Sequence, residues 1–223
     1  MNRIRIVLIH QNVICGGADK ALIDLATLLD KDRFDVTVFA IQGGGEWEHL
    51  LTEAGIRLVN PYSCMKPERG VLDKVRNRLK EIGIEKRKKN HGIGLIPYCL
   101  HESFDIAVSF HINNYCCKAV FLPNTKTVKY IHGDVGTNPY FRERIEVARE
   151  YLPRFDRIVC VSETAKKSFS EMTGITKGVE FVFNPLNSAD IIKKRMKYLP
   201  ICPRNRIFAR LDDSSGRKDS HDW

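Results

Sequence analysis

Short runs of apolar and β-branched residues alternate along the chain with segments whose apolar residues recur at helical spacing. The first run, at 4–9, predicts a buried strand, and the polar loop at 10–19 leads into a predicted helix with its last apolar position at Leu29. Helices are also predicted at 46–54 and 163–172, the second capped by Ser162 and ended by Gly174. Further strands are predicted at 35–41, 56–59, 104–110, 127–131, 157–161 and 179–183. This alternation predicts an α/β fold, a parallel sheet with helices on both faces.

The segment 66–91 departs from this pattern because it is strongly basic. Its apolar residues Val71, Val75, Leu79 and Ile82 keep helical spacing, which predicts an amphipathic helix with a thin apolar stripe. A basic run is most often a solvated face, and contact with an anionic membrane is the stronger functional alternative. Nucleic acid is the least favoured partner, since no aromatic residues are interleaved with the charges. The predicted membrane contacts are Arg76, Arg78, Lys80, Lys86, Arg87, Lys88 and Lys89.

Composition narrows the class of protein. Apolar residues make up 43% of the 223 residues, enough for a sizeable core. The 36 Lys and Arg residues exceed the 27 Asp and Glu residues and give a net charge of +9, which favours an anionic partner. The seven Cys show no zinc-like spacing, so we predict reduced thiols, no metal site and a cytoplasmic protein. No run approaches the roughly 20 apolar residues of a membrane span, so any association with the inner face of the plasma membrane is peripheral.

The loop at 15–19 follows a strand and opens a helix. Its glycines, Gly16 and Gly17, allow backbone amides to hold a diphosphate at the helix N-terminus. The alternative is an ordinary turn in which the glycines supply positive φ, and spacing alone does not choose between the two. Asp19, in the first helical turn, suits the helix dipole but opposes an anion.

His132 and Gly133 follow a predicted strand end, which is where ligand crevices form in open α/β sheets. A neutral or protonated imidazole there can bind a sugar hydroxyl or a phosphate, whereas spacing alone slightly favours a surface histidine that shapes a turn. Ser162 and Glu163 also follow a strand, although helix capping explains the serine. The other histidines near strand or helix ends (His10, His101 and His111) are interpreted as polar loop residues.

Taken in order, these segments resemble the N-terminal domain of a GT-B retaining glycosyltransferase of family 4. The resemblance implies a Rossmann-like acceptor-binding domain and transfer from a nucleotide sugar to a cell-envelope or capsular glycan or lipid, without a metal or other cofactor. It rests on a set of motifs: GGADKAL at 16–22, DVTVFAI at 35–41, LLTEAGIRLV at 50–59, FDIAVSF at 104–110, YIHGD at 130–134, FDRIVCVSETAKKSF at 155–169 and VEFVFNPLN at 179–187.

The resemblance also implies roles for single residues. Gly16 and Gly17 match the loop that approaches the donor diphosphate, and His132, the predicted catalytic residue, matches a histidine beside the transferred sugar. The other predicted contacts of the donor phosphates or the substrate are Gly133, Ser162, Glu163 and Asn184. Asn184 falls where the family's chain crosses between domains. Arg210, within RIFARLDD, takes the place of an arginine that holds the donor phosphates.

The end of the chain departs from the family pattern, because the second domain of the family is far longer. We therefore expect an acceptor domain at 1–185, a linker at 186–205 and a remnant of the donor domain at 206–223, in a truncated form with little or no activity. The alternative function is a stand-alone α/β module that binds a phosphorylated or glycan ligand without catalysis. The sequence does not predict the oligomeric state.

Overall fold

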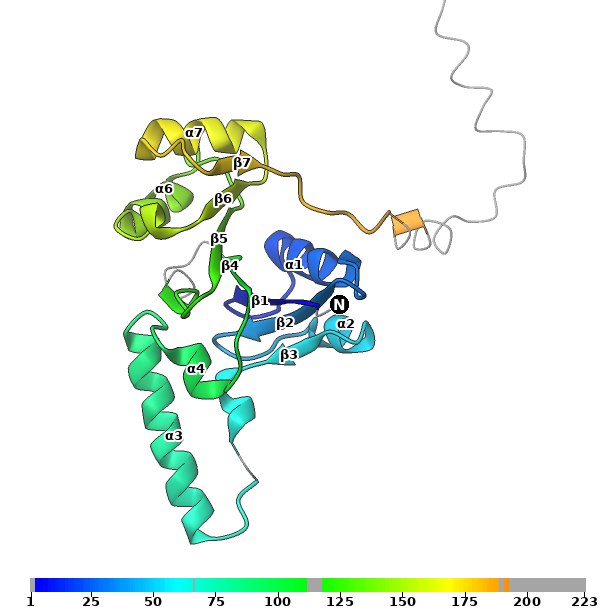
Figure 1. Cartoon of the computed structure of the whole chain (residues 1–223), viewed down its shortest axis with the longest axis vertical. Helices are drawn as coiled ribbons and strands as arrows, with labels where there is room; N and C mark the ends of the chain where they lie inside the picture. The colour runs from blue at the N-terminus through cyan, green and yellow to red at the C-terminus, as the bar shows by residue number, and fades with distance from the viewer. Residues whose placement is uncertain (1–2, 66, 112–117, 189–190, 193–223) are drawn as a thin grey trace, which may run out of the picture. The chain divides into compact units, whose positions relative to one another are not determined.

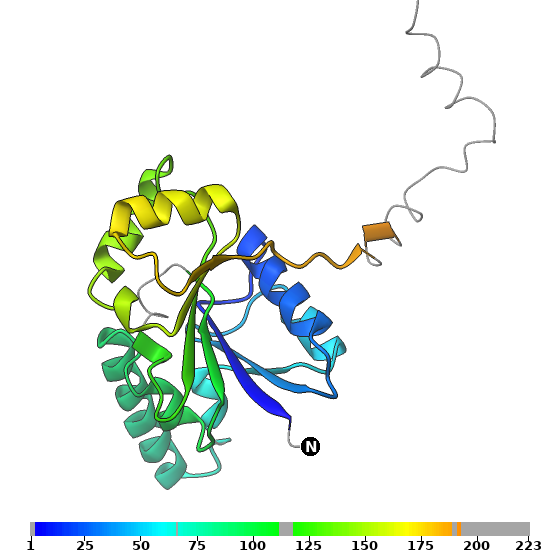
Figure 2. The same cartoon turned by 45° about the horizontal axis from the view of Figure 1, so that its top comes forward.

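The computed structural model describes residues 3–65, 67–111, 118–188 and 191–192. The chain divides into one unit at Met1–Leu186 and a second at Asn187–Trp223. Almost all of the second unit lies outside the described residues, including most of the predicted linker and all of the predicted remnant at 206–223. The first unit is drawn from two directions in Figures 1 and 2.

The described residues form one parallel sheet of seven strands in the order β3-β2-β1-β4-β5-β6-β7 (Figure 1). This sheet, with helices on both faces, confirms the predicted Rossmann-like α/β fold. β1 pairs with β2 on one side and with β4 on the other, so the strand order reverses around it. The strands are β1 (Ile4–His10), β2 (Phe34–Ala40), β3 (Arg57–Val59), β4 (Ile106–Ser109), β5 (Lys126–Ile131), β6 (Arg157–Cys160) and β7 (Val179–Phe181).

The helices connect successive strands. At α7 the side chain of Ser162 accepts a hydrogen bond from the Ala165 amide, and Gly174 ends the helix with a φ of 75°. Both ends of α7 therefore follow from short-range sequence signals. The helices are α1 (Gly17–Leu28), α2 (Glu48–Glu53), α3 (Val71–Lys89), α4 (Leu95–Cys99), α6 (Pro139–Ala148) and α7 (Glu163–Thr173), with short 3-10 turns η1 (Pro61–Cys64) and η2 (Leu152–Arg154).

The core lies on both faces of the sheet because side chains alternate along each strand. On β1, Ile6 and Leu8 pack in one cluster with residues of α1 and α2, while Val7 and Ile9 pack in the other. The second cluster includes buried residues from α3, α4, α6 and α7. A strand buried on both faces is apolar almost throughout, as the sequence of β1 is.

α3 is long but contributes little to the core. Its buried residues are Asn77 and Ile84, and Figure 1 shows the helix reaching away from the sheet. The predicted apolar stripe is exposed instead. The exposed fractions of its residues are 76% for Val71, 53% for Val75, 64% for Leu79 and 53% for Ile82, and Leu72, which was not part of the prediction, is 86% exposed.

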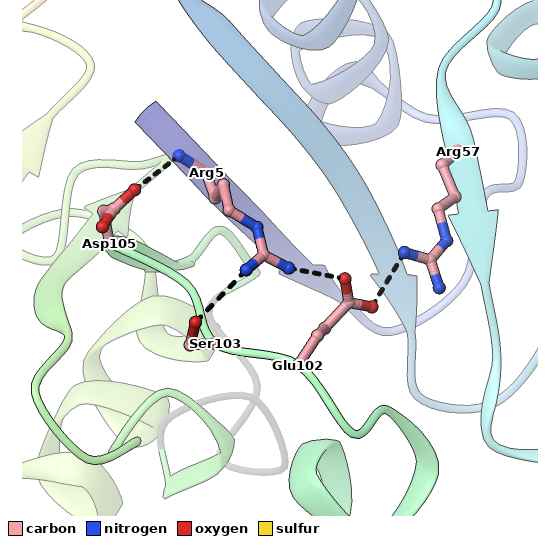
Figure 3. A network of polar contacts seen from close by, with 5 residues as sticks. All are labelled: Arg5, Arg57, Glu102, Ser103 and Asp105. Atoms are coloured by element: carbon pink, nitrogen blue, oxygen red, sulfur yellow. Dashed lines mark hydrogen bonds and ion pairs between the residues drawn. The ribbon is translucent and has the colours of Figure 1, made fainter. Parts of the chain in front are cut away.

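The amino edge of the sheet carries a polar network, shown in Figure 3. Glu102 accepts hydrogen bonds at 2.8 Å from Arg5 on β1 and at 2.8 Å from Arg57 on β3, and so links two strands that are separated by β2. Arg5 also donates to the Ser103 hydroxyl, and its backbone amide donates to Asp105 at 2.7 Å. Each charged side chain of this network therefore has a hydrogen-bond partner within the protein.

A Phe-Asp pair precedes both β4 and β6 and acts in the same way at each place. The carboxylate of Asp105 accepts from the Arg5 amide on the neighbouring strand β1. The carboxylate of Asp156 accepts from the Thr127 amide at 2.9 Å on the neighbouring strand β5. The repeated pair therefore ties two strand starts to their neighbours.

Candidate functional site

Polar side chains gather at the opposite, carboxyl edge of the sheet. His10 is the last residue of β1, His111 comes just after β4, and His132 follows β5 directly. These three strands are neighbours in the order β1-β4-β5. Because parallel strands bring their carboxyl ends to one edge, the three imidazoles share the region where open α/β sheets bind ligands.

An aromatic row holds this edge together. The ring of Phe110, which is fully buried, lies 4.7 Å from the Tyr130 ring, 4.5 Å from the His132 ring and 6.0 Å from the His10 ring. The His10 and His111 rings meet edge to face at 4.9 Å. Phe110 is therefore the packing centre between the imidazoles of β1 and β5.

The imidazole of His132 has a defined tautomer. Its Nε2 lies 2.7 Å from the carbonyl oxygen of Phe110, and because that oxygen only accepts, Nε2 carries the hydrogen. Its Nδ1 is buried without a hydrogen-bond partner among the described residues. Burial lowers the pKa of His132 to about 4, with a further contribution from Lys129, so the ring is neutral at physiological pH. A neutral Nδ1 is a hydrogen-bond acceptor.

Lys129 and His111 lie beside this row. Lys129 is fully buried and donates to the Ser109 hydroxyl at 3.0 Å and to the His111 carbonyl, which ties β5 to the end of β4. It forms no ion pair with a carboxylate in the part of the chain that the structure describes. Burial, followed by the charges of His10 and Lys129, lowers the pKa of His111 to about 3. At this edge, buried basic side chains therefore have few carboxylates near them.

The glycine loop does not use positive φ. Gly16 is the N-cap of α1 with a φ of −153°, and Gly17 is the first helical residue and is not in the left-handed region either. The interpretation of the loop as a turn that needs positive φ was therefore wrong. Gly16 is instead confined by its surroundings, because a Cβ on it would lie 2.6 Å from Oδ2 of Asp19, whereas nothing lies within 4 Å of a Cβ on Gly17. The space beside Gly17 is open.

The remaining predicted site residues have mixed surroundings. A Cβ on Gly133 would lie 2.1 Å from the ring of Phe141, so the packing of α6 alone requires a glycine there. Ser162 caps α7, and Glu163 is exposed beside it. Asn184 is half-buried, with its Oδ1 unpartnered among the described residues. Arg210 lies outside the described residues.

The interpretation of His10 as an ordinary loop residue was wrong, whereas His111 does lie in the loop that follows β4. β1 continues through His10, which is only 1% exposed, and its Nε2 lies 2.9 Å from Oδ1 of Asp19. Its hydrogen-bond partner, Asp19, lies nine positions further along the chain, so the residues next to His10 do not predict its burial. His101, in contrast, is exposed before β4.

The predicted membrane contacts on α3 differ in their surroundings. Arg87 and Lys88 turn toward the body of the domain, where they lie 3.8 Å from the ring centre of Tyr98 and 4.5 Å from that of Tyr62. Lys80 is half-buried, and the others are exposed: Arg76, Arg78, Lys86 and Lys89.

The described residues contain neither a metal-binding cluster nor a helix that could span a membrane. No group of three or more His, Cys, Asp or Glu residues there is arranged to hold a metal ion. None of the described helices combines the length and the apolar character that a bilayer crossing requires.

A family model described as Glycosyltransferase Family 4 matches residues 15–189. No curated protein matches the sequence significantly. Among solved structures, the chain resembles Anabaena Alr3699/HepE in complex with UDP and glucose, at 19% identity and a TM-score of 0.55. A complex of that protein with UDP-glucose gives 18% identity and a TM-score of 0.54, and each comparison covers 87% of this chain and 50% of the other.

A glycosyltransferase from Rickettsia africae is similar at 16% identity and a TM-score of 0.49, with 89% of this chain and 50% of the other covered. The chain therefore spans about half the length of these solved structures. At these identities the likeness to the two Anabaena complexes shows a shared fold alone, and the match to the family model over residues 15–189 gives the family.

Proposed function

The chain belongs to glycosyltransferase family 4, and we propose that it forms the acceptor-binding half of an enzyme that transfers a sugar, with retention, from a nucleotide sugar to a cell-envelope or capsular glycan or lipid. The observation that supports this proposal most directly is the cluster at the carboxyl edge. There the open loop at Gly17 and the imidazole of His132 lie beyond the carboxyl ends of β1 and β5 in the seven-stranded parallel sheet. The chain spans about half of the similar solved structures, so binding is the appropriate first readout.

The loop and the histidine are suited to different parts of a nucleotide sugar. Gly17 opens α1, and the unpaired amides of a first helical turn favour anions, so the diphosphate belongs beside this loop. A neutral His132 lacks the charge that would attract phosphate. A hydroxyl that reaches its Nδ1, which is buried in the free chain, would find a hydrogen-bond acceptor there. We therefore assign the sugar hydroxyls, rather than the phosphates, to His132. No metal or cofactor is part of this proposal.

A titration with UDP-glucose tests this assignment. We expect shifts of the Gly17 amide and the His132 ring signals in NMR spectra of the isotope-labelled chain, and none at the Gly174 amide beyond α7. Unchanged signals at Gly17 and His132 would contradict the proposal. Donor-dependent sugar transfer to a membrane extract by the 223-residue chain alone would contradict the expectation that this form has little or no activity.

α3 supports a membrane-associated acceptor. Leu72, Val75 and Leu79 are among five exposed apolar residues that share one side of the helix, while its buried residues, Asn77 and Ile84, lie on the opposite side. Cations flank the apolar side, an arrangement typical of helices that lie in the interface of an anionic bilayer. We propose that this side of α3 rests on the inner face of the plasma membrane, with the protein otherwise in the cytoplasm.

Vesicle flotation tests this contact. We expect the chain to bind vesicles of phosphatidylglycerol and phosphatidylcholine, and Leu79→Glu to weaken binding by about tenfold or more, since a buried leucine is worth roughly 1.5–3 kcal/mol. Leu28→Glu is the matched control, because Leu28 is also an exposed leucine on a helix, with 49% of its surface exposed. Equal losses for both variants would contradict a specific role for α3. Binding to duplex DNA, but not to vesicles, would favour nucleic acid.

A further inference from the structure

A buried polar contact joins the end of β1 to the first turn of α1. Nε2 of His10 lies 2.9 Å from Oδ1 of Asp19, with His10 1% exposed and Asp19 7% exposed. A carboxylate only accepts hydrogen bonds, so Nε2 of His10 is the donor. The other ring nitrogen, Nδ1, has no hydrogen-bond partner among the described residues. The contact therefore spans the loop that separates the strand from the helix.

The position of Asp19 in α1 makes this contact unusual. With Gly16 as N-cap and Gly17 as the first helical residue, Asp19 is the third residue of the helix. An acidic side chain at this position commonly reaches back to the amide of the N-cap residue. Here its described hydrogen-bond donor is His10, and no loop amide donates to it in the described part of the chain.

The carboxylate nevertheless stays close to the loop. A Cβ placed on Gly16 would lie 2.6 Å from Oδ2 of Asp19. If His10 did not hold Oδ1, the carboxylate would be free to turn toward the Gly16 amide, as acidic side chains at this helix position commonly do. It would then occupy the hydrogen-bond donors, and the positive end of the helix dipole, that an anionic ligand needs.

From this geometry we propose that His10 is a positioning residue for the donor diphosphate. It holds the Asp19 carboxylate away from the Gly16–Gly17 amides and so leaves the start of α1 open to an anion. The proposal rests on the proposed function, because it takes the glycine loop as the diphosphate site. It assigns a role to a histidine whose own neighbourhood in the sequence suggests none.

Binding of inorganic pyrophosphate to the 223-residue chain, followed at the Gly16 and Gly17 amides by NMR, tests the proposal. His10→Leu removes the donor and is expected to weaken binding by about fivefold or more, because the freed carboxylate competes for the loop. His10→Gln keeps a donor for Asp19 and is expected to bind within about twofold of the native chain. In His10→Leu/Asp19→Asn the competing charge is gone, and binding is expected to recover.

Recovery in the double variant separates positioning from simple damage, because a second substitution does not repair a disrupted fold. If His10→Leu fails to fold, Asp19→Asn alone carries the test, since the proposal expects binding at least as tight as in the native chain. Native binding by His10→Leu, no recovery in the double variant, or loss of binding in Asp19→Asn would overturn the role of His10 while leaving the diphosphate site in place. Failure of the native chain to bind pyrophosphate at the loop would overturn both.

Discussion

The amino edge of the sheet pairs its polar side chains, whereas the carboxyl edge buries several of them with unfilled hydrogen-bonding capacity. At the amino edge, Glu102 serves two arginines, and Asp156 accepts from the backbone and side chain of Thr127. At the carboxyl edge, Nδ1 atoms of His10 and His132 are buried without partners among the described residues. Both edges belong to the same strands, so the contrast does not come from differences in backbone structure.

The pKa values follow the same division. At the amino edge, the hydrogen bond from the Thr127 amide, followed by that from Lys126, lowers the pKa of Asp156, so the charged form is stabilised. At the carboxyl edge, burial lowers the pKa of His132 to about 4 and that of His111 to about 3, so the charged forms are excluded. Titratable groups whose pKa is strongly shifted by burial are typical of functional sites. The amino edge thus serves stability, and the carboxyl edge is where we propose that the ligand binds.

The largest effect is expected from the packing that holds the carboxyl edge. Phe110→Ala removes a fully buried ring from between His10, Tyr130 and His132, and we expect the free energy of unfolding to fall by about 3–5 kcal/mol. Urea denaturation at pH 7 measures it. Phe183→Ala is the control, since Phe183 is 71% exposed, and a loss within about 0.5 kcal/mol is expected. Similar losses for the two variants would remove the special role of Phe110.

The second largest effect is expected on acidification, which should lower the free energy of unfolding through the carboxyl edge. The folded-state pKa of His132, about 4, lies below the ordinary value of 6.5, so the unfolded chain takes up the proton first and stability falls as the pH drops between these values. Between pH 7 and pH 4.5 this loss is about 2–3 kcal/mol. His132→Gln is expected to lose that much less over the same range in urea denaturation, because it has no proton to gain. His101→Gln, at an exposed histidine near the amino edge, is expected to lose as much as the native chain.

If His132→Gln kept the full loss between pH 7 and pH 4.5, the neutral state of His132 would not be a property of the fold. His111, a half-buried histidine of the same edge, has its pKa lowered further and stays in the variant. His132→Gln is therefore expected to keep part of the loss in the free energy of unfolding. The size of that part measures the contribution of His111 against that of His132.

The amino edge gives a smaller response. Glu102→Ala removes hydrogen bonds at 2.8 Å to both Arg5 and Arg57, whose side chains are 36% and 53% exposed. Since solvent screens these contacts, we expect a loss of about 1–2 kcal/mol in the free energy of unfolding at pH 7. The His132 ring signals should not move, because the carboxyl edge is untouched. Glu171→Ala, at an exposed pair with Lys167, is the control and should cost less than about 0.5 kcal/mol.

The sequence predicted the sheet well because a strand buried on both faces leaves a local signal. The apolar run of β1 and the signals at Ser162 and Gly174 act over a few residues, and the structure places a strand and the ends of α7 there. α6 was not located, although its start carries a readable signal. Asn138 caps this helix and Pro139 is its first residue.

The site was harder to predict because its contacts join distant parts of the chain. The burial of His10 depends on Asp19, and the tautomer of His132 depends on the carbonyl of Phe110. For α3, spacing gave the apolar stripe, but spacing cannot say which side of a helix faces solvent. The position of Ile84 in the core, opposite the stripe, answers that question only in the folded structure.

The smallest expected effect concerns Asp156, and it tests whether the two edges titrate in separate ranges. Its folded-state pKa lies below the ordinary value of 3.8, so its contribution is present at neutral pH and is lost as the pH falls through the lowered value. Because the side chain is 37% exposed, Asp156→Asn should cost at most about 1 kcal/mol at pH 7. Stability curves of the native chain and the variant should run parallel from pH 7 to pH 4.5, where the histidines titrate, and converge only toward pH 3. Convergence already above pH 4.5 would mean that Asp156 responds to the histidines, and that the two edges do not act independently.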